Sequence, residues 1–189
     1  MATRKGTAAG SGARLAAPTV RVGVREPAVR HAVSPRPALR DKADRAPRRA
    51  LLDVNVLIAL LDADHLHHAR ASAWLSANIA AGWASCAITQ NGCVRIMSQP
   101  RYPNALPAAR VAQRLREATD TAHHQFVPAD LSLLDDEHFD TEQLLGHRQV
   151  TDAWLLGLAV RHGMRLVTFD SAITLRVVKM AGAGHLISI

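Results

Sequence analysis

The stretch ALLDVNVLIALLD (residues 50–62) is an apolar run that two polar residues, Asp53 and Asn55, interrupt near its start. The residues before Asp53 are typical of a short buried strand, and those after Asn55 favour a helix. A carboxylate between a strand and a helix can be a turn or cap residue, and it can also form the floor of a site. Which of these applies depends on what the other strands carry at their ends.

Residues 50–189 alternate between strand and helix signals. Strands are expected at 50–52, 83–88, 124–128, 165–169 and 185–189. Helices are expected at 56–61, 65–80, 90–98, 107–118 and 149–162. Thr89 and Asp130 are candidate N-caps of the segments that follow them. This alternation predicts the α/β class, with helices on both faces of a central, mostly parallel sheet in an α/β/α sandwich.

The N-terminal segment differs from the rest of the chain in charge and composition. Residues 1–50 contain twelve Lys and Arg against three Asp and Glu, a net charge of +9, whereas 51–189 have a net charge of −2. Residues 1–48 are rich in Ala, Arg, Pro and Gly and lack aromatic residues, so we expect a disordered basic tail before a folded domain at 50–189. A non-functional extension, an RNA-attracting arm and a targeting peptide are all open for the tail. The acidic balance of the domain argues against a basic nucleic-acid-binding module.

The sequence carries neither a membrane span nor a metal-binding cysteine pattern. No apolar stretch reaches the roughly 18 residues that a transmembrane helix needs, and no signal-peptide core is present near the start. Cys86 and Cys93 match no metal-ligand spacing and are expected to be buried free thiols. Free thiols suit a reducing compartment, so we expect a cytoplasmic protein.

Three Asp residues are expected to meet at one edge of the sheet. Asp53 and Asp170 each end an apolar strand, and Asp152 lies in the first turn of the helix before the second of these strands. Residues 89–91 follow the strand at 83–88, and ligands bind parallel sheets at the carboxyl ends of their strands. Each Asp alone could be a cap or turn residue. Because converging carboxylates repel one another, the pattern predicts Mg²⁺ or Mn²⁺ and phosphate chemistry.

Four segments together resemble the PIN-domain ribonucleases, and in particular the VapC toxins of type II toxin–antitoxin systems. They are LLDVNVLIALLDADHLHHARASAWL, ITQNGCVRIMSQPRYPN, GHRQVTDAWLLGLAVRHGMRLVTFD and HLISI. The motifs D-x-N-V-L, T-D-A-x-L-L-x-L-A and V-T-F-D are specific in combination and in order. The resemblance covers residues 51–189. It implies a PIN-like fold and a divalent-metal-dependent endoribonuclease, which hydrolyses phosphodiester bonds in cellular RNA by a metal-activated water.

The resemblance also implies roles for individual residues. The catalytic, metal-binding carboxylates would be Asp53, Asp152 and Asp170. The polar residues that support them would be Asn55, Gln90, Thr151 and Thr168. Gln90 stands where the family commonly has Glu, so the cluster carries one negative charge fewer. We therefore expect one firmly held Mg²⁺ or Mn²⁺ ion, with a second recruited mainly when RNA phosphate is present.

Three further residues are candidate RNA contacts. Arg95 could reach a phosphate near the carboxylates, and it could equally be a surface residue. Arg101 and Tyr102 lie in the proline-bounded segment QPRYPN, where a basic–aromatic pair could contact RNA. The alternative for this pair is a rigid turn in which the tyrosine packs against the domain.

The resemblance implies partners as well. It predicts a cognate VapB-like antitoxin that places a basic side chain in the acidic site. It also predicts a homodimer, sought at the exposed apolar faces of the first helices. Two alternatives stay open: a housekeeping RNA-processing nuclease without an antitoxin, and a catalytically impaired RNA- or protein-binding module, which the neutral Gln90 motivates.

Overall fold

The computed structural model describes residues 47–189, so the predicted disordered tail at 1–48 lies, except for its last two residues, outside the described part. Within it, five strands form one sheet in the order β3-β2-β1-β4-β5. They are β1 Ala50–Leu52, β2 Trp83–Cys86, β3 His124–Val127, β4 Arg165–Thr168 and β5 Leu186–Ser188. Each neighbouring pair is parallel, which confirms the predicted parallel sheet.

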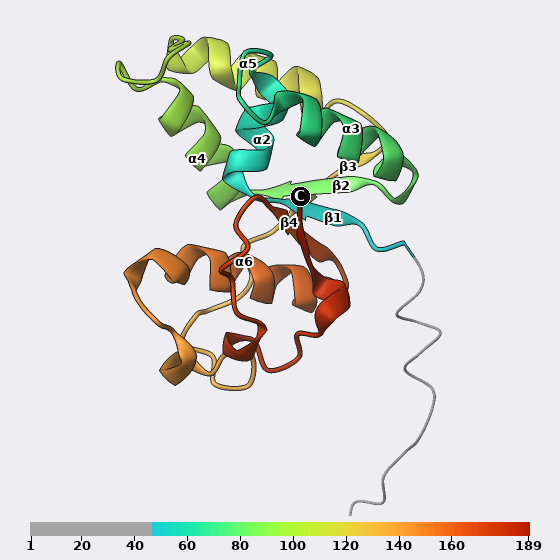
Figure 1. Cartoon of the computed structure of the whole chain (residues 1–189), viewed down its shortest axis with the longest axis vertical. Helices are drawn as coiled ribbons and strands as arrows, with labels where there is room; N and C mark the ends of the chain where they lie inside the picture. Colours follow the sequence, from blue (N-terminus) through green and yellow to red (C-terminus); the bar gives the residue numbers. More distant parts are fainter. Residues whose placement is uncertain (1–46) are drawn as a thin grey trace, which may run out of the picture. The chain divides into compact units, whose positions relative to one another are not determined.

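Helices cover both faces of this sheet (Figure 1). The α-helices are α2 Val54–Leu61, α3 His68–Asn78, α4 Ala87–Met97, α5 Ala108–Thr119 and α6 Val150–Arg161. Short 3₁₀ turns lie at Ile79–Ala81, Thr141–Gln143, His147–Gln149, Leu175–Val177 and Ala183–His185. Figure 1 shows α2–α5 on one side of the sheet and α6 on the other. The described residues therefore form the predicted α/β/α sandwich.

Side chains of the central strands alternate between two apolar clusters, one on each face of the sheet. Leu51 and Leu166 belong to the cluster that includes the buried residues of α6. Leu52 and Val167 belong to the cluster that includes the buried residues of α2, α4 and α5. Strands β1 and β4 are thus buried on both faces, which is why their sequences are short continuous apolar runs.

Two element boundaries differ from the prediction because side chains bond locally to the backbone. Helix α3 begins at His68, since in the turn before it Asp62 Oδ1 accepts a hydrogen bond from the Asp64 N–H and His65 Nδ1 accepts one from the His67 N–H. Strand β2 ends at Cys86 and α4 begins directly after it. Thr89 is therefore inside the helix instead of capping it, and its Oγ1 accepts a hydrogen bond from the Cys86 N–H at 3.0 Å.

The segment after β3 forms turns where a capped helix was expected. Asp130 does not cap it, because its carboxylate pairs instead with His162 at 2.9 Å and Arg161 at 3.4 Å, at the end of α6. Leu131 and Phe139 are buried against α6. The backbone of this segment thus follows the surface of α6 because its apolar side chains pack there.

Two expectations from composition concern the thiols and the membrane. Cys86 and Cys93 are both buried and free, as predicted. Over residues 47–189, none of the helices combines the length and the apolar character that crossing a membrane requires.

Candidate active site

Asp53 connects the first strand to the first helix of the described domain. It follows β1 directly and is the N-cap of α2, where its Oδ1 accepts a hydrogen bond of 2.6 Å from the Val54 N–H. Its Oδ2 accepts a hydrogen bond of 2.9 Å from the Thr168 hydroxyl. Only 6% of Asp53 is exposed. The stretch 50–62 is therefore a strand and a helix that meet at a buried carboxylate, as its pattern predicted.

Thr168 bonds to both Asp53 and Asp170. It is the last residue of β4 and is fully buried. Its hydroxyl donates to Asp53 and accepts a hydrogen bond of 3.0 Å from the Asp170 N–H. Asp170 is exposed, and its Oδ1 accepts a hydrogen bond of 2.7 Å from the Ala172 N–H. One buried hydroxyl thus fixes Asp53 relative to the backbone of Asp170.

Asp152 completes the acidic cluster from the first turn of α6. Burial raises its pKa to about 6, and the negative charges of Asp53 and Asp170 add to this rise. Burial also raises the pKa of Asp53, with a further rise from Asp170, although the hydrogen bonds from Thr168 and Val54 act in the opposite direction. The three carboxylates therefore repel one another.

A pocket of about 420 Å³ lies over Asp53 and Asp152. Its lining comes from the end of β1, the first turns of α2 and α6, and one face of α4: Asp53, Val54, Asn55, Ile88, Asn91, Gly92, Arg95, Ile96, Thr151 and Asp152. We call it the carboxylate pocket. Of the predicted supporting residues, Asn55 and Thr151 line it and are exposed. Arg95, a predicted RNA contact, brings a positive charge to it.

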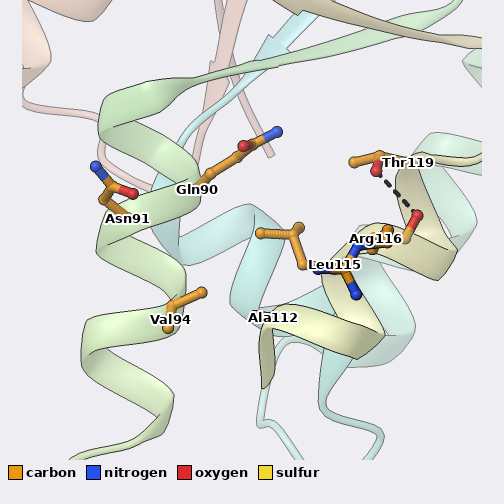
Figure 2. Close-up of a pocket in the computed structure, with 7 residues that line it drawn as sticks. All are labelled: Gln90, Asn91, Val94, Ala112, Leu115, Arg116 and Thr119. Carbon is orange, nitrogen blue, oxygen red and sulfur yellow. Dashed lines mark hydrogen bonds between the residues drawn. The ribbon is translucent and has the colours of Figure 1, made fainter. Parts of the chain in front are cut away.

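Gln90 does not line the carboxylate pocket. Its side chain faces a second pocket of about 320 Å³ between α4 and α5 (Figure 2). There its Nε2 donates a hydrogen bond of 2.9 Å to the Ser85 hydroxyl, which also bonds to His124 Nε2 at 2.9 Å. The sequence led us to expect Gln90 beside Asp53 and Asp152, and the structure does not place it there. The physical reason is the phase of α4, which directs this side chain toward α5.

Tyr102 and Arg101 have different surroundings. The Tyr102 hydroxyl donates a hydrogen bond of 2.6 Å to Asp62 Oδ2, and the ring packs against the apolar cluster of α2, α4 and α5. Asn104 donates to the same carboxylate at 3.0 Å. These contacts fit the packed turn that was the alternative for this pair, whereas Arg101 is exposed. An RNA contact by either residue stays a prediction.

Sequence reasoning missed a stacked group beside Asp170. The Phe169 ring lies 4.6 Å from the His67 ring, between centroids, and the Arg70 guanidinium lies 5.2 Å from the Phe169 centroid. These residues come from distant parts of the chain, so no spacing in the sequence indicates their contact. Arg70 is exposed, and Phe169 directly precedes Asp170 in the chain.

Sequence reasoning also missed Gly92, although a glycine inside a predicted helix is a signal of close packing. A Cβ added to it would lie 2.9 Å from Val54 Cγ2. Helix α4 therefore approaches α2 closely at the residue next to Asp53. This contact brings the side chains of α4 to the carboxylate pocket.

The oxygen donors of the cluster suit a hard divalent cation. Over residues 47–189, no three acidic, histidine or cysteine side chains are close enough to enclose an ion by themselves. Mg²⁺ is commonly bound by one or two carboxylates and keeps several waters, so it does not need such a cage. The raised pKa values of Asp53 and Asp152 show an acidic cluster that a cation would neutralise.

The chain is similar to several known proteins. The family model of the PIN domain matches residues 50–178. The chain is 54% identical over 138 residues to Ribonuclease VapC44 of Mycobacterium tuberculosis, which covers 73% of this chain and 97% of that protein. It is 46% identical over 125 residues to Ribonuclease VapC38 of the same species. That match covers 66% of this chain and 86% of VapC38. A crystal structure of VapBC2 from Rickettsia felis, bound to a DNA fragment from its promoter, is similar with a TM-score of 0.48. That match has 13% identity and covers 74% of this chain and 98% of the other.

Proposed function

Because the chain belongs to the PIN domain family and, within it, to the VapC ribonucleases, we propose that it is the toxin of a VapBC-type module. As such a toxin it hydrolyses phosphodiester bonds in cellular RNA at the carboxylate pocket. The observation that carries this proposal is the convergence of Asp53, Asp152 and Asp170, whose mutual repulsion contributes to the raised pKa values of Asp53 and Asp152.

We propose Asp53, Asp152 and Asp170 as the residues that hold Mg²⁺ or Mn²⁺. When bound, such an ion polarises the phosphoryl oxygen and lowers the pKa of the attacking water. Thr168 supports this site because its hydroxyl occupies one lone pair of Asp53 and fixes the orientation of the carboxylate. Each oxygen of Asp53 accepts one hydrogen bond and keeps a further lone pair for a ligand.

The chain must also attract a phosphate to an acidic pocket. Arg95 lines this pocket and can pair with the phosphate next to the bond that is cut. Arg70 lies over Phe169, beside Asp170, and offers a second positive charge. Since residues 51–189 carry a net charge of −2, these local cations provide the attraction that the domain as a whole lacks.

The same pocket suits an antitoxin. Its carboxylates can accept hydrogen bonds from an Arg side chain, and charge-assisted pairs of this kind are strong. Its lining also includes the apolar residues Val54, Ile88 and Ile96, and Ile88 is 42% exposed. We therefore propose a VapB-like antitoxin segment that combines an Arg with apolar anchors. Binding of this segment would exclude RNA from the site.

We also propose a homodimer through the region of the first helices. Leu66, which precedes α3, is 89% exposed and offers an apolar contact there. A Leu66→Glu substitution would place a charge in this contact and is expected to convert dimers to monomers in light-scattering measurements. An unchanged mass would place the dimer contact elsewhere or exclude the dimer.

The test of the proposed function is cleavage of purified RNA. The wild-type protein is expected to cleave RNA with Mg²⁺ or Mn²⁺ and to stop when EDTA is added, whereas Asp53→Ala and Asp152→Asn are inactive. Asp136→Asn is the matched control, because Asp136 is an exposed carboxylate outside the pocket. RNA binding without cleavage by the wild type would support the impaired-module alternative. Mapping of cleavage sites after brief expression in growing cells, with Asp53→Ala as control, identifies the RNA.

A further inference from the structure

We infer that Asn91, and not Gln90, is the polar residue that α4 contributes to the carboxylate pocket, where its side-chain oxygen contacts the bound divalent ion or one of its waters. This inference rests on the proposed function, since it concerns the same site. Asn91 would be a positioning and binding residue without charge. The site would then combine three carboxylates with one neutral amide.

The first support is the geometry of α4. The α4 residues that line the carboxylate pocket are Ile88, Asn91, Gly92, Arg95 and Ile96. Their spacing of three and four residues places them on one face of the helix, because each residue turns the helix by about 100°. Gln90 lies two positions from Ile88 and so points away from this face. Asn91 lines both pockets and therefore lies at the edge between them, whereas Gln90 lines the second pocket only. Figure 2 shows the side chains of Gln90 and Asn91 leaving α4 in different directions.

The second support is that Gln90 is already engaged. Its amide donates to the hydroxyl of Ser85, which is fully buried in β2. The same hydroxyl bonds to His124 of β3. If Gln90 turned toward Asp53, it would remove one partner from a buried polar group, which is unfavourable. This network therefore ties Gln90 to the two strands under α4 and α5.

The third support is the close contact between α4 and α2. Gly92 packs against Val54, where even a methyl group would be too close. Asn91 is therefore held next to the helix that begins at Asp53, and it lines the pocket together with Asp53 and Asp152. Its side chain is exposed, so it is accessible to an ion, a water or an RNA phosphate.

Two charge-matched variants of the full chain test the inference by calorimetric titration with Mn²⁺ in the absence of RNA. Asn91→Asp adds a carboxylate to the pocket and is expected to tighten Mn²⁺ binding about tenfold. Gln90→Glu adds the same charge at the neighbouring residue and is expected to leave the affinity within about twofold, because it faces the other pocket. Tighter binding by Gln90→Glu, with no change for Asn91→Asp, would overturn the inference.

Two uncharged variants provide a second test in case the charged variants do not fold. Asn91→Ala is expected to weaken Mn²⁺ binding about threefold without lowering the melting temperature of the metal-free protein. Gln90→Met is expected to lower that melting temperature, since Ser85 loses a donor, and to keep the Mn²⁺ affinity. The opposite pattern would overturn the inference.

The Asp152→Asn variant separates the two proposals. If the wild type binds Mn²⁺ and Asp152→Asn does not, the proposed metal site stands, and the four variants above decide the role of Asn91. If the wild type and Asp152→Asn both fail to bind Mn²⁺, the proposed metal site is wrong and the inference about Asn91 is overturned with it.

Discussion

The Thr168 hydroxyl donates a 2.9 Å hydrogen bond to the carboxylate of Asp53, a residue 115 positions earlier in the chain. Asp53 directly follows β1 and Thr168 ends β4, and these two strands are parallel neighbours. The same hydroxyl accepts the backbone N–H of Asp170. This single buried group therefore connects the carboxylate of Asp53 to the backbone of Asp170, and it couples the packing of the sheet to the proposed site.

Removal of this hydroxyl is expected to lower both stability and activity. Thr168→Val keeps the shape of the side chain but leaves buried Asp53 without one of its two donors, at a cost of about 1–3 kcal/mol. The melting temperature and the kcat for RNA cleavage should both fall. Thr168→Ser keeps the hydroxyl and serves as the control, with activity close to that of the wild type. Equal activity of the Val and Ser variants would contradict the role given to this hydrogen bond.

Neutralising Asp152 is expected to stabilise the metal-free protein while abolishing cleavage. The pKa of Asp152 is about 6 in the folded protein, above its ordinary value of 3.8. Between these values the folded protein binds more protons than the unfolded chain, so the charged carboxylate lowers stability as the pH rises. In EDTA, the melting temperature of Asp152→Asn should therefore rise relative to the wild type from about pH 4 to pH 7.

At pH 7, Mn²⁺ should make the melting temperature of the wild type higher than that of Asp152→Asn. The ion is expected to stabilise the wild type, because it binds only the folded state, and to leave Asp152→Asn unchanged. Melting curves with and without Mn²⁺ measure both effects. A difference between the two proteins that is constant from pH 4 to pH 7 would mean that burial and its neighbours do not perturb Asp152.

The fold was predictable because the strands carry a strong local signal. Residues 50–52 and 166–168 are buried on both faces of the sheet and so appear as short apolar runs, each followed by or ending in a polar residue. The boundaries were harder to predict, since local hydrogen bonds decide them. Helix α2 begins at Val54, two residues earlier than expected, because the Asp53 side chain accepts the Val54 N–H and starts the helix at once.

Only those site residues that follow directly from the ends of the strands could be predicted from the sequence. Asp53 and Asp170 come together because β1 and β4 are parallel neighbours, a feature that alternating strands and helices imply. The direction of Gln90 depends on the phase of α4 and on its bond to Ser85, which only the packed structure defines. The contact of Phe169 with Arg70 depends on tertiary packing in the same way.

The contact between Gly92 and Val54 is expected to set the distance between α4 and the carboxylates. In Gly92→Ala, the gain in helix propensity of about 1 kcal/mol opposes an overpacking cost of about 1–3 kcal/mol, so stability changes little or falls moderately. Cleavage should fall more, because Asn91 and Arg95 move with α4. Gly146→Ala is the control, since an added Cβ there meets nothing within 4 Å. Wild-type cleavage by Gly92→Ala would show that the site tolerates the displacement.

The hydroxyl of Tyr102 is expected to stabilise the fold without contributing to RNA binding. Tyr102→Phe removes its bond to Asp62, a carboxylate that is 7% exposed, while Asn104 still donates to that carboxylate. The free energy of unfolding should fall by about 1–3 kcal/mol, and the KM for RNA should stay unchanged because the ring still packs in place. Arg101→Ala is the matched comparison, since Arg101 is exposed next to it and its loss should raise the KM if this loop contacts RNA. A Tyr102→Phe variant with normal stability and a raised KM would instead place its hydroxyl on the RNA.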